Sequence, residues 1–205
     1  VHVGEALRAS AFQVVSILTT TGFGTADFDQ WPSVCKVLLV ALMFVGGCAG
    51  STGGGIKVVR LLLFLKYARL QLRSLVHPRA VVTIKLGRTK VPQEVMVAIL
   101  GYFALYVAFF FTASVVVTAM GVDLVTGTTA VIATLNNIGP GLQQVGPAAH
   151  FGHLPALAKV VLSICMLAGR LELYALAVLL TPDFWTMARK PRWRWPVLAR
   201  PATRE

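Results

Sequence analysis

The stretch LTTTGFGTADFDQW (residues 18–31) follows a short apolar segment and contains three successive threonines, then Gly22-Phe23-Gly24. No charged residue occurs in it before Asp27. Hydroxyls and glycines in this order predict a backbone that approaches another group closely. That group could be a phosphate, a second helix or an ion.

Composition indicates a membrane protein. Of the 205 residues, 56% are hydrophobic and 13% are charged, and the mean hydropathy is +0.73. A soluble domain carries about 25% charged residues, so this chain has too few polar side chains to cover a surface facing water. The chain begins at Val1 without a methionine or a signal-peptide pattern, so we expect part of a longer protein.

Four apolar segments differ in length. A spanning helix requires about 20 apolar residues, and residues 92–120 and 154–180 meet that requirement. Residues 6–18 and 125–135 are too short to cross a bilayer. Runs of their length are typical of re-entrant segments.

A fifth apolar segment, residues 33–72, is interrupted by GGCAGSTGGG (residues 46–55). Six glycines in ten residues would not remain helical, because each glycine costs about 1 kcal/mol relative to alanine. Irregular backbone at membrane depth must lie in protein or beside water. We therefore expect a broken helix with its irregular middle inside the membrane.

Basic residues predict the orientation. Residues 66–90 contain seven lysines and arginines, whereas residues 22–34 and 140–156 contain none. The positive-inside rule therefore places a basic loop (residues 73–91) and a basic tail (residues 183–205) in the cytoplasm. The net charge of +11 then reflects orientation and contact with lipid. Nucleic acid is not an expected partner.

The two halves of the chain repeat one order of elements. Gly22 in TTTGFG and Gly139 in NNIGPG lie 117 positions apart (139 − 22), each after a short apolar segment and before a polar loop. Internal repeats are common in membrane transport proteins. We expect an all-α polytopic membrane protein of helix–re-entrant loop–helix pore repeats, one in residues 1–72 that lacks its first helix and one in residues 92–182.

A phosphate loop and helix packing both compete to explain the glycines. A phosphate loop requires GxxxxGK[ST], but Ile56 separates Gly55 from Lys57 and valine follows the lysine. Small residues also allow helices to approach each other in lipid. That interpretation stays open for residues 46–55, although three successive glycines argue against a helix there.

An ion filter explains the two xxGxG loops best. Backbone carbonyls can replace the hydration shell of a cation where an extended loop directs them into a pore. Residues 20–24 have the order of the potassium-channel TVGYG, with a hydroxyl, a spacer, glycine, an aromatic residue and glycine. Residues 137–141 keep both glycines. Two such loops after short helices favour a filter over the alternatives.

Five stretches of the sequence together resemble the pore-forming membrane subunit of Trk-type potassium uptake systems, in the Trk/Ktr/HKT superfamily. They are TTTGFGTADF, GGCAGSTGGGIK, HPRAV (residues 77–81), NNIGPG and GRLELYALAVLLTPDFW (residues 169–185). The resemblance implies four repeats around one pore, of which this chain is similar to the third without its first helix and the complete fourth. It implies one filter glycine per repeat. The expected filter residues are Thr20, Thr21, Gly22, Phe23, Asn137, Ile138, Gly139 and Pro140. Potassium would bind the backbone carbonyls of Thr20, Thr21, Gly22, Asn137, Ile138 and Gly139.

The resemblance further implies an intramembrane gating loop beneath the filter and an arginine, here Arg170, that projects toward it from the last helix. Inserting an arginine at the centre of a membrane helix costs roughly 2.5–3.5 kcal/mol. We therefore expect Arg170 to face the pore and to act as a barrier there. Pairing with another helix is the alternative. Glu172, two positions away, is not its expected partner. The expected gate residues are Gly46, Gly47, Gly50, Ser51, Thr52, Gly53, Gly54, Gly55 and Arg170.

The function expected from these features is potassium uptake across the cell inner (cytoplasmic) membrane by a multi-pass protein. No hydrolytic or redox constellation is visible, so we expect no enzyme and no cofactor, with K⁺ as the transported ion. The alternative is a non-conducting membrane module that assembles with or regulates a cation pore. The resemblance implies a homodimer and a cytosolic nucleotide-binding regulatory subunit as partners, with membrane lipid as the other candidate for the basic segments.

Two features of the outer loops have simple interpretations. We expect Asp27 and Asp29 to add negative potential at the outer mouth, which would attract cations. His150 and His153 are expected in a solvated loop, and a metal pair there is the less favoured alternative.

Overall fold

The structure is a computed structural model that describes residues 3–51, 53–77, 84–87 and 89–188. Thr52 of the expected gate and most of the basic tail lie outside these residues. The helices are α1 (Val3–Leu18), α2 (Ser33–Met43), α3 (Val58–Val76), α4 (Gln93–Ala119), α5 (Leu124–Leu135), α6 (Ala156–Leu171), α7 (Leu173–Leu180) and α8 (Pro182–Ala188). Three 3₁₀ turns are η1 (Phe28–Gln30), η2 (Gln143–Val145) and η3 (Phe151–His153), and the strands are β1 (Lys85–Leu86) and β2 (Thr89–Lys90).

The lengths of most apolar segments are confirmed. Helix α4 has 27 residues and, among the described helices, it alone is long and apolar enough to cross a membrane without a break. Helices α1 and α5 are short, as expected, and α2 and α3 are separated by the glycine-rich segment. The start of α5 is fixed by Asp123, whose carboxylate accepts hydrogen bonds from the backbone N–H groups of Val125 (3.0 Å) and Thr126 (3.3 Å).

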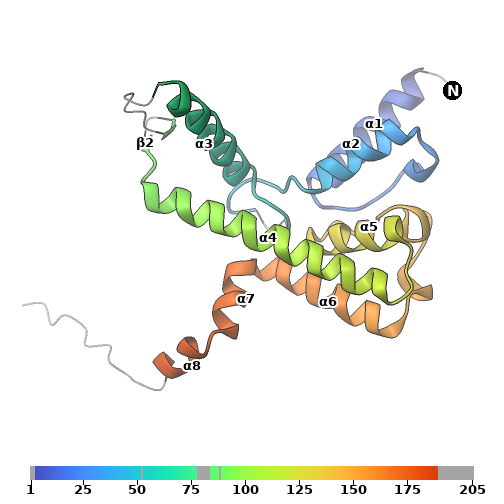
Figure 1. Ribbon diagram of the computed structural model, residues 1–205. Coiled ribbons are helices and arrows are strands. Elements are labelled where there is room, and N and C mark those ends of the chain that lie inside the picture. Colours follow the sequence, from blue (N-terminus) through green and yellow to red (C-terminus); the bar gives the residue numbers. More distant parts are fainter. Residues whose placement is uncertain (1–2, 52, 78–83, 88, 189–205) are drawn as a thin grey trace, which may run out of the picture.

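Residues 154–180 do not form one straight helix, contrary to expectation. Helices α6 and α7 are bent by 109° at Glu172, which has a φ of 64°. Contacts with distant elements hold the bend: Glu172 pairs with Arg60 of α3, and the hydroxyl of Tyr174 donates to the carbonyl of Ala98 in α4 (2.6 Å). After the bend, α7 leads to α8, which lies away from the α4–α6 bundle (Figure 1).

The segment expected as a basic loop is more structured than the sequence indicates. Helix α3 continues to Val76, so the expected boundary after residue 72 falls within it. Strands β1 and β2 then form a small antiparallel hairpin that turns at Gly87 (φ 62°). The chain is therefore mostly helical, with one short hairpin between α3 and α4.

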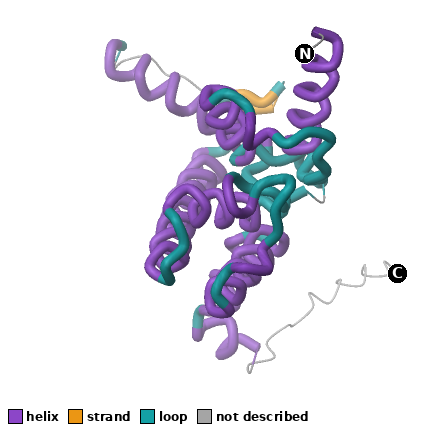
Figure 2. Tube along the Cα trace, turned by 90° about the vertical axis from the view of Figure 1, so that its right-hand side faces the viewer, coloured by secondary structure: helices purple, strands orange, loops and turns teal. Residues whose placement is uncertain are grey.

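The core has three apolar clusters. The largest joins α4, α5 and α6 through residues such as Tyr106, Leu135 and Cys165. A second joins α1 and α2 to the loop after α5, and a third joins α3 to the first half of α4. Figure 2 shows the connecting loops gathered in the middle of the molecule among the helices. Close backbone contacts of Gly22 with Ile138 and of Gly54 with Asn136 bring the two xxGxG loops and the glycine-rich segment together.

Candidate functional site

The two xxGxG loops leave their helices with the same backbone hydrogen bonds. The N–H groups of Thr21 (2.9 Å) and Gly22 (3.4 Å) both donate to the carbonyl of Ser16. The N–H groups of Ile138 (2.9 Å) and Gly139 (3.5 Å) donate to the carbonyl of Ala133 in the same way. Each of these residues in the second loop lies 117 positions after its counterpart in the first. The spacing found in the sequence therefore also relates the backbone hydrogen bonds of the two loops.

Residues with a left-handed backbone conformation (positive φ) produce the turn in both loops. Thr20 and its counterpart Asn137 have φ values of 56° and 55°, and Gly22 and Gly139 have φ values of 77° and 112°. Side chains rarely adopt this region, because the β-carbon approaches the following carbonyl. The glycines are therefore required by the backbone conformation at both positions.

Six carbonyl groups of these loops accept no hydrogen bond from described residues. In the hydrogen bonds that join described residues, no donor reaches the carbonyl oxygens of the six expected potassium ligands: Thr20, Thr21, Gly22, Asn137, Ile138 and Gly139. The next carbonyl along the first loop differs, because that of Phe23 accepts from the hydroxyl of Ser16 (2.7 Å). The Phe23 ring is exposed. Unpaired carbonyls in a row are the arrangement that a dehydrated cation needs.

The first loop lies directly against the second. A β-carbon at Gly22 would overlap the carbonyl oxygen of Ile138 and lie 3.3 Å from the ring of Pro140. At Gly139 a β-carbon would meet no described atom within 4 Å. Gly22 is thus required for close approach as well as for its φ value, whereas Gly139 is required for its φ value within this chain.

The glycine-rich segment lies against both loops. A parallel bridge between Val45 and Ile56 closes it, with the N–H of Gly46 donating to the carbonyl of Ile56 (2.9 Å). A β-carbon at Gly54 would overlap the backbone carbonyl of Asn136, and one at Gly53 would lie 3.0 Å from the hydroxyl oxygen of Thr20. Gly54 therefore allows close contact with the backbone of Asn136, and Gly53 leaves room for the side chain of Thr20.

Asn136 connects the second loop to helix α4. It is fully buried, and its side-chain oxygen accepts a hydrogen bond from the hydroxyl of Tyr106 (2.8 Å). Its amide nitrogen donates to the carbonyl of Ile132 (2.9 Å). A β-carbon at Gly55 would lie 2.9 Å from the same side-chain oxygen. Asn136, at the start of the second xxGxG loop, thus contacts both the glycine-rich segment and α4, which the sequence does not indicate.

A cavity of about 260 Å³ separates the glycine-rich segment from the end of α6. It is lined by Gly50, Ser51, Gly53, Gly55, Lys57, Tyr102, Gly169, Arg170 and Glu172. Arg170 therefore lines the same cavity as part of the glycine-rich segment. Lys57 is a second cation there, and its ammonium group donates to the carbonyls of Ser51 (2.8 Å) and Gly53 (2.5 Å). In the sequence, only the position of Lys57 two residues after the last glycine could have indicated that it lies beside this segment.

Glu172 pairs with a residue far away in the sequence. One of its oxygens lies 2.9 Å from a guanidinium nitrogen of Arg60 in α3. The Arg60 guanidinium also lies 4.2 Å from the centre of the Tyr102 ring, in the position of a cation–π contact. This contact joins α3, α4 and the bend between α6 and α7. No local pattern in the sequence indicates the pairing.

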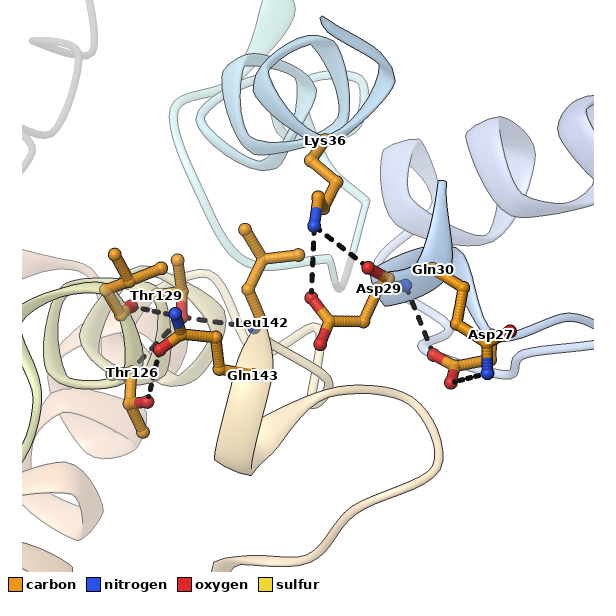
Figure 3. A network of polar contacts seen from close by, with 9 residues as sticks. Asp27, Asp29, Gln30, Lys36, Thr126, Thr129, Leu142 and Gln143 are labelled. Atoms are coloured by element: carbon orange, nitrogen blue, oxygen red, sulfur yellow. Dashed lines mark hydrogen bonds and ion pairs between the residues drawn. The ribbon is translucent and has the colours of Figure 1, made fainter. Parts of the chain in front are cut away.

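Asp27 and Asp29, in the loop between α1 and α2, have structural roles. The Asp27 carboxylate accepts from the N–H of Asp29 (3.1 Å) and from the Gln30 amide (3.0 Å), and caps η1. The Lys36 ammonium lies 3.9 Å from the Asp29 carboxylate and donates to its backbone carbonyl (2.9 Å) (Figure 3). Lys36 therefore offsets part of the negative potential expected at the outer mouth.

The second outer loop is held to α5 by hydroxyl groups. The Thr126 hydroxyl donates to the side-chain oxygen of Gln143 (3.1 Å), and the Thr129 hydroxyl accepts from the N–H of Leu142 (3.1 Å) (Figure 3). The rings of His150 and His153 lie 5.9 Å apart further along. Within the described part of the chain, no group of three or more His, Cys, Asp or Glu side chains is placed to hold a metal ion.

Comparisons with known proteins show which family this chain resembles. The family model TrkH, described as a cation transport protein, matches residues 1–186. The Trk system potassium uptake protein TrkH of Halomonas elongata is 49% identical over 181 residues, which cover 88% of this chain and 37% of that protein. The protein of the same name from Escherichia coli K12 is 47% identical over 179 residues, covering 87% and 37%.

A solved structure is also similar. The crystal structure of the potassium transporter TrkH from Vibrio parahaemolyticus matches with a TM-score of 0.82 and 49% identity, over 88% of this chain and 38% of that one. The chain spans 37% of the length of these curated relatives. The matching family model, the level of identity and the shared fold lead to one conclusion: the chain belongs to the TrkH family of cation transport proteins.

Proposed function

We propose that the chain supplies two of the four repeats of a potassium uptake pore in the cell inner membrane. The observation that carries the proposal is the set of six carbonyl oxygens, three from each loop, that accept no hydrogen bond from described residues. Repeated carbonyls at one depth can replace the hydration shell of K⁺. The relatives named above are potassium uptake proteins, and transport rather than catalysis is the function of the family.

The surface of α4 supports a position in lipid. Its exposed side chains include Phe111 (62%) and Val115 (66%), and the sequence of the helix is apolar all round. A helix of that kind is stable in hydrocarbon or in a protein core, and most of this one is not buried in the chain. In the proposed multi-pass orientation, the basic connection between α3 and α4 faces the cytoplasm.

The glycine-rich segment is the proposed gate. It lies against Asn136 and Thr20, so an ion leaving the two filter loops would meet it next. Lys57 and Arg170 line the cavity on its other side. Two positive charges in a low-dielectric passage repel a passing cation, because screening there is weak. Displacement of the segment together with these cations would open the path.

The partners in this proposal are a second copy of the protein and a cytosolic nucleotide-binding subunit. The relatives carry the name of a Trk system, which denotes more than one component. The basic residues after α3 are the proposed contact for the regulator. The rival proposal, a non-conducting module that regulates a pore, predicts that the full-length protein alone does not conduct.

Uptake of rubidium into proteoliposomes containing the full-length protein tests the proposal. Gly22→Ala should lower uptake and the preference for K⁺ over Na⁺, because its β-carbon overlaps the carbonyl of Ile138. Gly4→Ala is the matched control, since a β-carbon there meets no described atom within 4 Å. If folded Gly22→Ala protein kept the wild-type uptake and the wild-type preference for K⁺ over Na⁺, the proposed role of Gly22 in an ion filter would be rejected. Absence of uptake in the wild type would favour the regulatory module.

A further inference from the structure

A second cavity lies outside the proposed pore, between the C-terminal half of α3 and strand β1. Its volume is about 460 Å³. Its lining combines four cations and three apolar side chains: Lys66, Arg69, Arg73, Lys85, Leu70, Leu72 and Ile84. We refer to it as the basic cavity. Nothing in the proposed filter or gate uses these residues.

Helix geometry brings three of the cations together. Lys66, Arg69 and Arg73 follow the spacing i, i+3 and i+7, so they lie on one face of α3. Lys85 comes from the hairpin. The Lys66 ammonium donates to the backbone carbonyl of Lys85 (2.9 Å) and joins the two walls. The cavity is therefore a product of the fold and not only of a basic run of sequence.

Among the described residues, these cations form no ion pair with an acidic side chain. No aspartate or glutamate occurs between Asp29 and Glu94. The ion pairs formed by described residues join Lys36 to Asp29 and Arg60 to Glu172, and neither involves the basic cavity. Like charges around one cavity raise its potential. An anion bound between them would lower the electrostatic energy of the site.

The neighbouring apolar surface indicates which anion fits. Leu65, Leu72 and Val76 are exposed and recur at helical spacing along α3, on a stripe beside the basic face. Leu72 is 65% exposed and also lines the basic cavity. A ligand with a phosphate and a hydrocarbon chain can thus place its phosphate among the cations and its chain along the stripe. A free phosphate or a nucleotide would leave the stripe uncovered.

We propose that the basic cavity binds the phosphate group of an anionic phospholipid of the cytoplasmic leaflet. Basic pockets at the cytoplasmic ends of membrane helices suit such headgroups, at about 1 kcal/mol per basic residue. The inference rests on the proposed orientation of the chain in the membrane. It does not depend on conduction, so lipid binding and transport can be tested separately.

Native mass spectrometry of the full-length protein with added phosphatidylglycerol or phosphatidylcholine tests the proposal. We expect selective binding of phosphatidylglycerol. The double variant Arg69→Gln/Arg73→Gln should weaken it about 30-fold, from two basic residues. The control Arg8→Gln/Lys90→Gln also removes two charges but leaves the lining of the basic cavity intact, and it should bind as the wild type does.

Four results would overturn the proposal. Equal loss in both double variants would indicate diffuse attraction to charge. Displacement of the lipid by millimolar glycerol phosphate would identify a free phosphate as the ligand. If Arg69→Gln/Arg73→Gln abolished binding of the regulatory subunit and left lipid binding unchanged, the basic cavity would be assigned to that partner. A wild-type protein that transports rubidium without preferring phosphatidylglycerol would refute this inference and leave the proposed function intact.

Discussion

Replacing Tyr106 with phenylalanine removes one buried hydroxyl and changes little else. That hydroxyl donates to the side-chain oxygen of Asn136 (2.8 Å), and both residues are buried. Asn136 keeps its bond to the carbonyl of Ile132. Its side-chain oxygen has no other described donor. The substitution therefore leaves one polar atom unpaired between α4, the second filter loop and the glycine-rich segment.

The expected loss of unfolding free energy lies where two known ranges overlap. A buried acceptor left unsatisfied costs about 1–3 kcal/mol in soluble proteins. Hydrogen bonds between membrane helices average about 0.6 kcal/mol and reach about 1.7 kcal/mol. Asn136 is enclosed, and removal of one oxygen atom leaves too little room for a water molecule. We therefore expect Tyr106→Phe to lower the free energy of unfolding by about 1.5 kcal/mol, near the upper end of the membrane range.

Reversible unfolding of the full-length protein in mixed micelles of a mild detergent and SDS measures this change. Tyr67→Phe is the matched control, because it makes the same substitution in a partly buried tyrosine whose hydroxyl has no hydrogen bond to a described residue. We expect no change above about 0.5 kcal/mol in the control. Equal unfolding free energies for the two variants would refute the assigned role of the Tyr106–Asn136 bond.

Three further predictions concern the proposed gate and the bend. Gly54→Ala should destabilise the closed segment and raise rubidium uptake, because its β-carbon overlaps a filter-loop carbonyl; uptake at or below the wild-type level would contradict this. Lys57→Met and Arg170→Ala should each raise cation flux and leave the K⁺/Na⁺ preference unchanged, which matched proteoliposomes can measure; lower flux in folded variants would make both cations structural. Arg60→Glu and Glu172→Arg should each destabilise the protein by about 1 kcal/mol, and the double charge reversal should restore part of that loss; additive losses would show that the ion pair contributes nothing.

Local signals in the sequence predict the short helices, the loops and their repeat. The lengths of the apolar segments before Thr19 and Asn136 limit α1 and α5, because a helix that short cannot cross a bilayer. The glycines at positions 22 and 139 indicate where the backbone adopts a positive φ. The same signal predicts that Gly46–Gly55 is not helical, and the described residues of this segment, 46–51 and 53–55, are not in a helix. Each of these features depends on residues close together in the chain.

Features that depend on distant residues could not be predicted. The bend at Glu172 is held by Arg60, 112 positions earlier, and by the bond from Tyr174 to Ala98, 76 positions earlier. Apolar composition alone favours a continuous helix there. The same limit explains Lys57, since only the folded loop brings its ammonium group to the carbonyls of Ser51 and Gly53.

The position of Asn136 links the selectivity and the gating of the proposed pore. Its backbone carbonyl contacts Gly54, whereas its side chain is held by Tyr106 and by the carbonyl of Ile132. Movement of the glycine-rich segment would break the first contact and leave the other two in place. The second filter loop would then keep its shape while the segment moves. For this reason the variants that open the proposed gate should change flux without changing selectivity, whereas loss of the Tyr106 hydroxyl should affect both.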